Sequence, residues 1–152
     1  MIKELNGDEI KVVEDYIQLV FKDNPDYKYY FLGEPKRNYA KRGFLIGNNS
    51  FYVDVELINS VNFVGMCKLQ TVKNNFLTDI ITLFERLYEE YGRIGIIRAM
   101  EDKKTKKLHE HIRKRFEKRG DIVKSADNGI ISVTIITKKG GVHDDLKKYN
   151  PL

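Results

Sequence analysis

The sequence has one cysteine, Cys67, in 152 residues, so no disulfide can form within the chain. We therefore expect a reducing, cytoplasmic compartment. No apolar run approaches the roughly 20 residues of a transmembrane helix, and the first residues lack the apolar core of a signal peptide. HExxH and CxxC patterns are missing, and His109 and His111 would project about 200° apart on a helix. We therefore expect neither a membrane span nor a metal site.

Hydrophobic residues make up 41% of the chain and charged residues 32%, which is typical of a globular protein. The length suits one domain, which we expect over residues 1–137, followed by a tail at 138–152 with little apolar content. The protein is basic, with a net charge of +5 and a pI near 9.1. Residues 101–120 contain nine Lys or Arg against four Asp or Glu, so the excess is local.

Hydrophobic periodicity and turn residues predict the order of the elements. Helices are expected where apolar residues recur every three or four positions, at residues 9–21, 76–91 and 103–119. Strands are expected at residues 2–5, 43–46, 50–58, 61–72, 93–100, 121–124 and 130–137. Gly65 is the expected place for a bulge in the long strand at 61–72, and Asp54 and Glu56 are expected on a solvated strand face.

This order of elements, together with the helix-end phrase RFEKRGD at residues 115–121, resembles the GNAT superfamily of N-acetyltransferases. The resemblance implies an α/β (α+β) fold with a mixed, mainly antiparallel twisted sheet flanked by helices. It also implies direct transfer of an acetyl group from acetyl-CoA to an amine. The acceptor amine and the oligomeric state stay open, because fold alone does not determine function.

The resemblance further implies a cofactor cleft between the strand at 61–72 and the strand at 93–100. The pantetheine arm would lie along the end of the first strand, and the pyrophosphate at the N-terminus of the next helix. The glycine-rich loop of the superfamily is replaced here by a shorter stretch without glycine. The residues implied in cofactor binding are Leu69, Gln70, Thr71, Val72, Lys73, Asn74 and Asn75.

The expected catalytic groups are few. Glu56 and Glu101 are the candidate bases, with Asp54 as a further carboxylate. Phe116 occupies the position at which the superfamily often has a tyrosine that protonates the departing thiolate, so this acid is missing. An open alternative is therefore a catalytically silent domain that serves as a protein-binding or structural component, for instance of a phage.

A second alternative is a small nucleic-acid-binding protein. Lys104, Lys107, Lys114 and Lys118 could contact phosphates, either of CoA or of a nucleic acid, or could simply face water. The aromatic and basic stretch at residues 27–42 could stack bases, line an acceptor pocket or cover the core. Composition does not decide between these interpretations.

Overall fold

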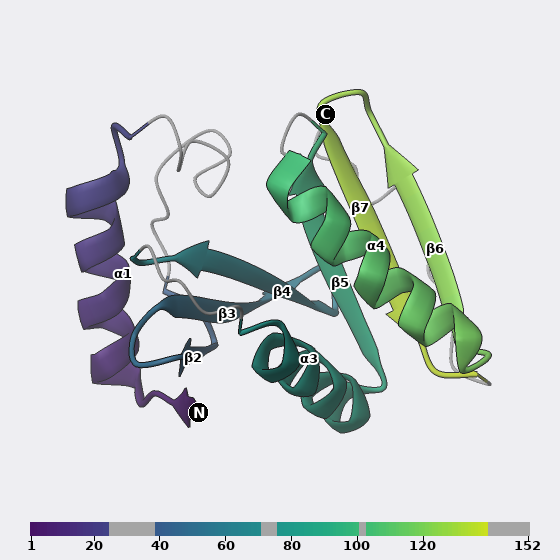
Figure 1. The fold of residues 1–152 in the computed structure, drawn as a ribbon, viewed down its shortest axis with the longest axis horizontal. Coiled ribbons are helices and arrows are strands. Elements are labelled where there is room, and N and C mark those ends of the chain that lie inside the picture. Colours follow the sequence, from purple (N-terminus) through teal and green to yellow (C-terminus); the bar gives the residue numbers. More distant parts are fainter. Residues whose placement is uncertain (25–38, 71–75, 101–102, 140–152) are drawn as a thin grey trace. The chain divides into compact units, whose positions relative to one another are not determined.

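A computed structural model describes residues 1–24, 39–70, 76–100 and 103–139. Three helices and seven strands lie in these ranges (Figure 1). The helices are α1 (Gly7–Phe21), α3 (Leu77–Tyr91) and α4 (Lys103–Lys118). The strands are β1 (Ile2–Glu4), β2 (Arg42–Ile46), β3 (Phe51–Ile58), β4 (Val61–Lys68), β5 (Arg93–Ala99), β6 (Ile122–Asp127) and β7 (Ile131–Thr137). None of the described helices has the length and apolar composition needed to cross a bilayer.

The strands pair in the order β1-β2-β3-β4-β5-β7-β6. The pairs β1–β2, β2–β3, β5–β7 and β6–β7 are antiparallel, while β4 and β5 are parallel, with Asn62 opposite Ile94 and Phe63 opposite Gly95. The sheet is thus mixed and mainly antiparallel, which confirms the expected fold class. The chain divides into two compact units, with a boundary inside β3, β4 and α3.

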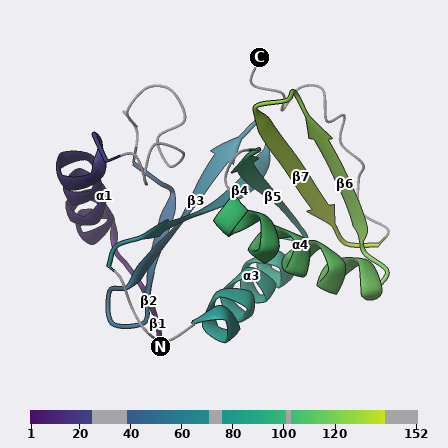
Figure 2. The same ribbon diagram turned by 45° about the horizontal axis from the view of Figure 1, so that its top comes forward.

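The first unit comprises residues 1–56 and 65–83. Its helix α1 begins with a capping box, in which the Asn6 side chain accepts from the Glu9 N–H and the Glu9 carboxylate accepts from the Asn6 N–H. The Asn6 N–H, followed by Lys3, lowers the pKa of Glu9. Helix α1 packs against β2 (Figure 2). The buried core of this unit contains Leu5, Ile10, Ile17, Ala40, Tyr52 and Cys67.

The turn between β2 and β3 has three successive left-handed residues, Gly47, Asn48 and Asn49. Gly47 has φ +64°, and a Cβ there would lie 2.7 Å from the Phe76 ring. Phe76 also packs edge-on against Phe51, with ring centroids 6.0 Å apart. Glycine is therefore required at position 47 by conformation and by space.

The second unit comprises residues 57–64 and 84–152, described as far as residue 139. Helix α4 packs against β5 and β6 (Figures 1 and 2). It buries Ile112 and Phe116, and the Phe116 ring lies 4.6 Å from that of Tyr88 in α3. Gly92 and Gly120, which follow α3 and α4, have positive φ, as expected of residues that end helices.

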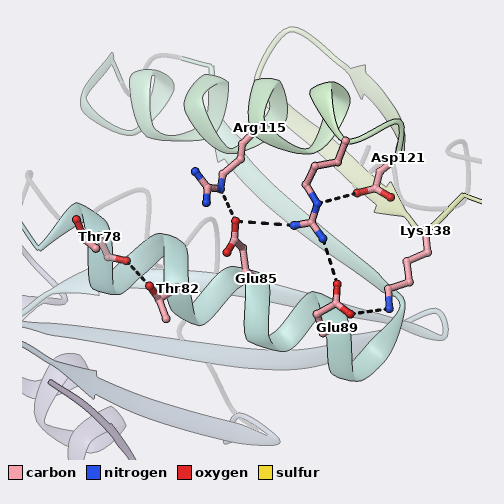
Figure 3. A network of polar contacts seen from close by, with 8 residues as sticks. Thr78, Thr82, Glu85, Glu89, Arg115, Asp121 and Lys138 are labelled. Atoms are coloured by element: carbon pink, nitrogen blue, oxygen red, sulfur yellow. Dashed lines mark hydrogen bonds and ion pairs between the residues drawn. The ribbon is translucent and has the colours of Figure 1, made fainter.

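Ion pairs connect α3, α4 and the residue after β7 on the surface of this unit (Figure 3). Arg115 donates to Glu85, and Arg119 donates to Glu89 at 3.1 Å. The Lys138 ammonium contacts the other Glu89 oxygen at 2.9 Å, so the first residue of the expected tail is held here. Lys138, followed by Arg119, lowers the pKa of Glu89.

Three details of the sequence prediction were wrong. The strand expected over residues 61–72 ends at Lys68, because its partner β3 begins at Phe51 and the last main-chain bond between them joins the Leu69 N–H to the Ser50 oxygen. The strand expected over 121–124 continues to Asp127, because β6 stays paired with β7 through exposed polar residues that show no hydrophobic pattern. Asp54 is buried rather than solvated.

Candidate functional site

One face of β3 carries polar side chains into the interior of the first unit. Tyr52, Asp54 and Glu56 alternate along the strand and therefore share a face. Tyr52 is fully buried, Asp54 is 4% exposed and Glu56 is half-buried. From α1, Glu14 reaches the same region and is itself 4% exposed. We call Glu14, Asp54 and Glu56 the carboxylate cluster.

Glu14 is held by donors from two other segments. The Tyr52 hydroxyl donates to Glu14 Oε1 at 3.0 Å, and the Ala40 N–H contacts both carboxylate oxygens at 3.2 Å. The pKa of Tyr52 is raised, first by burial and then by the negative charges of Glu14 and Asp54. Tyr52 therefore keeps its proton, and Glu14 connects α1 to β3 and to Ala40, two residues before β2.

Asp54 has room because residue 65 on β4 is a glycine. A Cβ at Gly65 would lie 2.5 Å from Asp54 Oδ1, closer than such atoms can approach. Gly65 was expected to mark a bulge; in the structure it lies within β4 and makes space for the Asp54 carboxylate. The expectation of a solvated Asp54 failed because β3 is covered on this face.

The sequence contained one overlooked signal for the cluster. Ile10, Glu14 and Ile17 are all buried, and their spacing of four and three residues places them on one face of α1. A glutamate within a buried helical stripe needs hydrogen-bond donors, but the sequence could not show that Tyr52 and Ala40 supply them.

The end of β4 and the start of α3 belong to the same unit as the cluster. Because the Leu69 N–H bonds to the oxygen of Ser50, the residue before β3, the main-chain groups of Lys68 at the end of β4 point to the opposite edge of the strand. The Gln70 amide donates to the Asn48 oxygen at 3.1 Å. Of the other residues implied in cofactor binding, Thr71, Val72, Lys73, Asn74 and Asn75 lie outside the described ranges, as does Glu101.

Helix α3 presents free main-chain donors at its N-terminus. Its first intrahelical bond joins the Ile80 N–H to the Phe76 oxygen at 3.0 Å. The N–H groups of Thr78 and Asp79 precede this bond, and the described part of the chain offers them no carbonyl of an earlier helical turn. The Asp79 carboxylate would repel an anion here, but it is paired with the Met1 ammonium at 2.9 Å.

Phe116 does not line a site in the structure. It is 1% exposed and packs on Tyr88, with the Arg119 guanidinium 5.3 Å from its ring centroid. The Tyr88 hydroxyl is buried without a well-formed hydrogen bond. Burial, followed by the nearby Asp121 carboxylate, raises the pKa of Tyr88.

The structure describes only some of the residues that the sequence suggested for contacts with phosphates or bases. Lys107, Lys114 and Lys118 are exposed on α4, whereas the side chain of Lys104 is outside the described part of the chain. Residues 25–38 are also outside it. Of the aromatic and basic stretch, the Tyr39 hydroxyl donates to Asp15 at 2.7 Å. Arg42 makes two bonds to Glu4, at 2.8 and 2.9 Å, so both side chains are engaged within the unit. Among the described residues, no three or more His, Cys, Asp or Glu side chains are arranged so that they could hold a metal ion.

Known structures share this arrangement of strands and helices. A point mutant of spermidine N-acetyltransferase from Vibrio cholerae has a TM-score of 0.57 at 14% identity, over 90% of this chain and 94% of that one. The N-acetyltransferase PseH from Campylobacter jejuni, solved with acetyl coenzyme A, has a TM-score of 0.52 at 13% identity, over 91% and 100%. No family model and no curated protein matches the sequence. The chain therefore has the fold of the GNAT superfamily of N-acetyltransferases, as its order of elements had indicated.

Proposed function

We propose that the protein is a CoA-dependent N-acyltransferase that transfers an acetyl group directly to an amine. The observation that carries the proposal is the carboxylate cluster on β3, in a chain with an N-acetyltransferase fold. Acceptor amines are ammonium ions near neutral pH, and a group of carboxylates attracts such a cation and can take its proton.

The described residues fit the cofactor at two places. The N–H groups of Thr78 and Asp79, at the positive end of the α3 dipole, suit a pyrophosphate. The outward main-chain groups of Lys68 suit an amide of a pantetheine arm. When bound, acetyl-CoA supplies an activated thioester carbonyl.

We assign Glu56 as the base. Glu14 is occupied by Tyr52 and Ala40, and Asp54 is almost fully buried, whereas Glu56 is half-buried and can meet a substrate. After Glu56 takes the proton, the amine nitrogen attacks the carbonyl, the C–N bond forms and the C–S bond breaks. The departing thiolate takes up the second proton, which the attacking nitrogen loses as the amide forms, because neither of the two side chains considered as an acid supplies one. Phe116 has none, and the raised pKa of Tyr52 makes that hydroxyl a poor acid.

The test separates binding from chemistry. Acetyl-CoA at a hundredfold excess over its Kd should stabilise the native state by about 2.7 kcal/mol. Acetylation of a panel of amines that includes spermidine would be followed by mass spectrometry. Glu56→Gln should keep the thermal shift but lower kcat/KM about 10²-fold or more, while Glu90→Gln, the same change on the exposed side of α3, should change neither.

Two results would contradict the proposal. If millimolar acetyl-CoA leaves the melting temperature unchanged, the protein is a catalytically silent domain with this fold. If Glu56→Gln acetylates amines at the wild-type rate, the base lies elsewhere.

A further inference from the structure

The outer face of α4 carries a row of four lysines with one histidine among them. At about 100° per residue, Lys103, Lys107, His111, Lys114 and Lys118 fall within a sector of about 80°. All five side chains are exposed. Ile112 and Phe116, which anchor the helix, lie on the opposite side and are buried. We call these five residues the lysine row.

The arginines of α4, and Arg119 directly after the helix, form ion pairs with carboxylates. Arg113 pairs with Glu117 at 3.8 Å. Arg115 pairs with Glu85, and Arg119 pairs with Glu89 at 3.1 Å (Figure 3). The lysine row makes no ion pair with a carboxylate in the described ranges. Among the described residues, no carboxylate therefore neutralises the four lysines, although they lie on the same helix as the paired Arg113 and Arg115.

We propose that the lysine row binds the phosphate backbone of double-stranded nucleic acid. The row extends over about 22 Å, with basic side chains every three or four residues, which matches an extended polyanion better than a single small anion. Lysine ammonium groups act as point charges toward phosphate. Phosphate contacts of this kind position a duplex without reading its sequence.

The composition of the row disfavours other partners. It contains no apolar side chain, and an interfacial membrane helix would need an apolar face toward the lipid. It contains no phenylalanine, tyrosine or tryptophan, the residues on which bases of single strands stack. The interaction with a duplex would be electrostatic, and it is independent of the proposed acyl transfer.

The test measures binding of the whole protein to a short labelled DNA duplex by fluorescence anisotropy over a range of salt concentrations. The logarithm of the association constant should fall with the logarithm of salt concentration, by about 0.9 per phosphate contact. Lys107→Gln and Lys114→Gln should each weaken binding and reduce the slope by about 1. Lys106→Gln is the matched control, because Lys106 is exposed on the same helix but projects about 100° from the centre of the row.

Three outcomes would overturn the inference. The first is that the duplex does not bind at low salt. The second is that Lys106→Gln weakens binding as much as Lys107→Gln, which would indicate that the net charge of the protein, rather than the lysine row, binds the duplex. In the third, polyglutamate or anionic vesicles compete with the duplex at equal charge concentration, which would indicate an acidic protein or a lipid surface. Unchanged melting temperatures of the variants would show that the fold is intact.

Discussion

Replacing Tyr52 by phenylalanine removes one hydroxyl from the interior of the first unit. This hydroxyl donates to Glu14 at 3.0 Å, and both side chains are almost fully buried. A hydrogen bond to a charged group contributes about 1.5–3 kcal/mol, and Glu14 would keep only the Ala40 N–H as a donor among the bonds described above. We therefore expect Tyr52→Phe to lower the free energy of unfolding by about 1.5–3 kcal/mol, and the melting temperature by about 3–12 °C.

Urea denaturation of Tyr52→Phe, Glu14→Gln and the double variant would measure the coupling between the two side chains, expected at about 0.5–3 kcal/mol. Tyr39→Phe is the matched control, because its hydroxyl also donates to a carboxylate, that of Asp15, but the side chain is exposed. It should cost much less than Tyr52→Phe. Equal losses in the two phenylalanine variants, or a coupling energy near zero, would refute the idea that burial makes this bond important.

Three further predictions concern pH, the core and the packing of β4. The raised pKa values of Tyr52 and Tyr88 keep both hydroxyls protonated in the folded protein; their contribution to stability is therefore complete below about pH 10 and is lost as pH rises above it. Denaturation at several alkaline pH values should show a slope of about 1.4 kcal/mol per pH unit for each tyrosine, and Tyr52→Phe should remove one such contribution. Phe116→Tyr should lower stability by about 1–3 kcal/mol without raising acetyl transfer, because its ring is buried on Tyr88; a gain in kcat would place this position in the site. Gly65→Ala should cost about 1–3 kcal/mol in urea denaturation, and an undiminished cost in an Asp54→Ala background would show that Asp54 is not the obstacle.

Local patterns in the sequence predicted most elements of the fold. The apolar periodicity predicted a helix at residues 9–21, where α1 lies, and Asp54 and Glu56 were correctly expected on one face of β3. Gly92 marked the end of α3. Strand ends were less predictable, because the end of β4 depends on where its partner β3 begins rather than on its own residues.

The candidate site depended more on tertiary contacts. Glu56 could be selected from the sequence, but Glu14 could not, because its role requires α1 to place it beside Tyr52, 38 positions along the chain. The sequence shows that Phe116 has no hydroxyl to act as an acid, but only the structure shows that its ring is part of the core. Sequence spacing also could not distinguish Arg115 from the lysines of α4, since the carboxylate that pairs with it, Glu85, lies on α3.

The single cysteine makes the first unit accessible to thiol-labelling experiments without any mutation. Cys67 is 3% exposed and packs in the same core as Tyr52, so a thiol reagent can reach it only when that core opens. In the regime where reclosing is faster than modification, the labelling rate reports the free energy of opening. The chain thus carries its own probe for whether a ligand such as acetyl-CoA rigidifies this half of the protein.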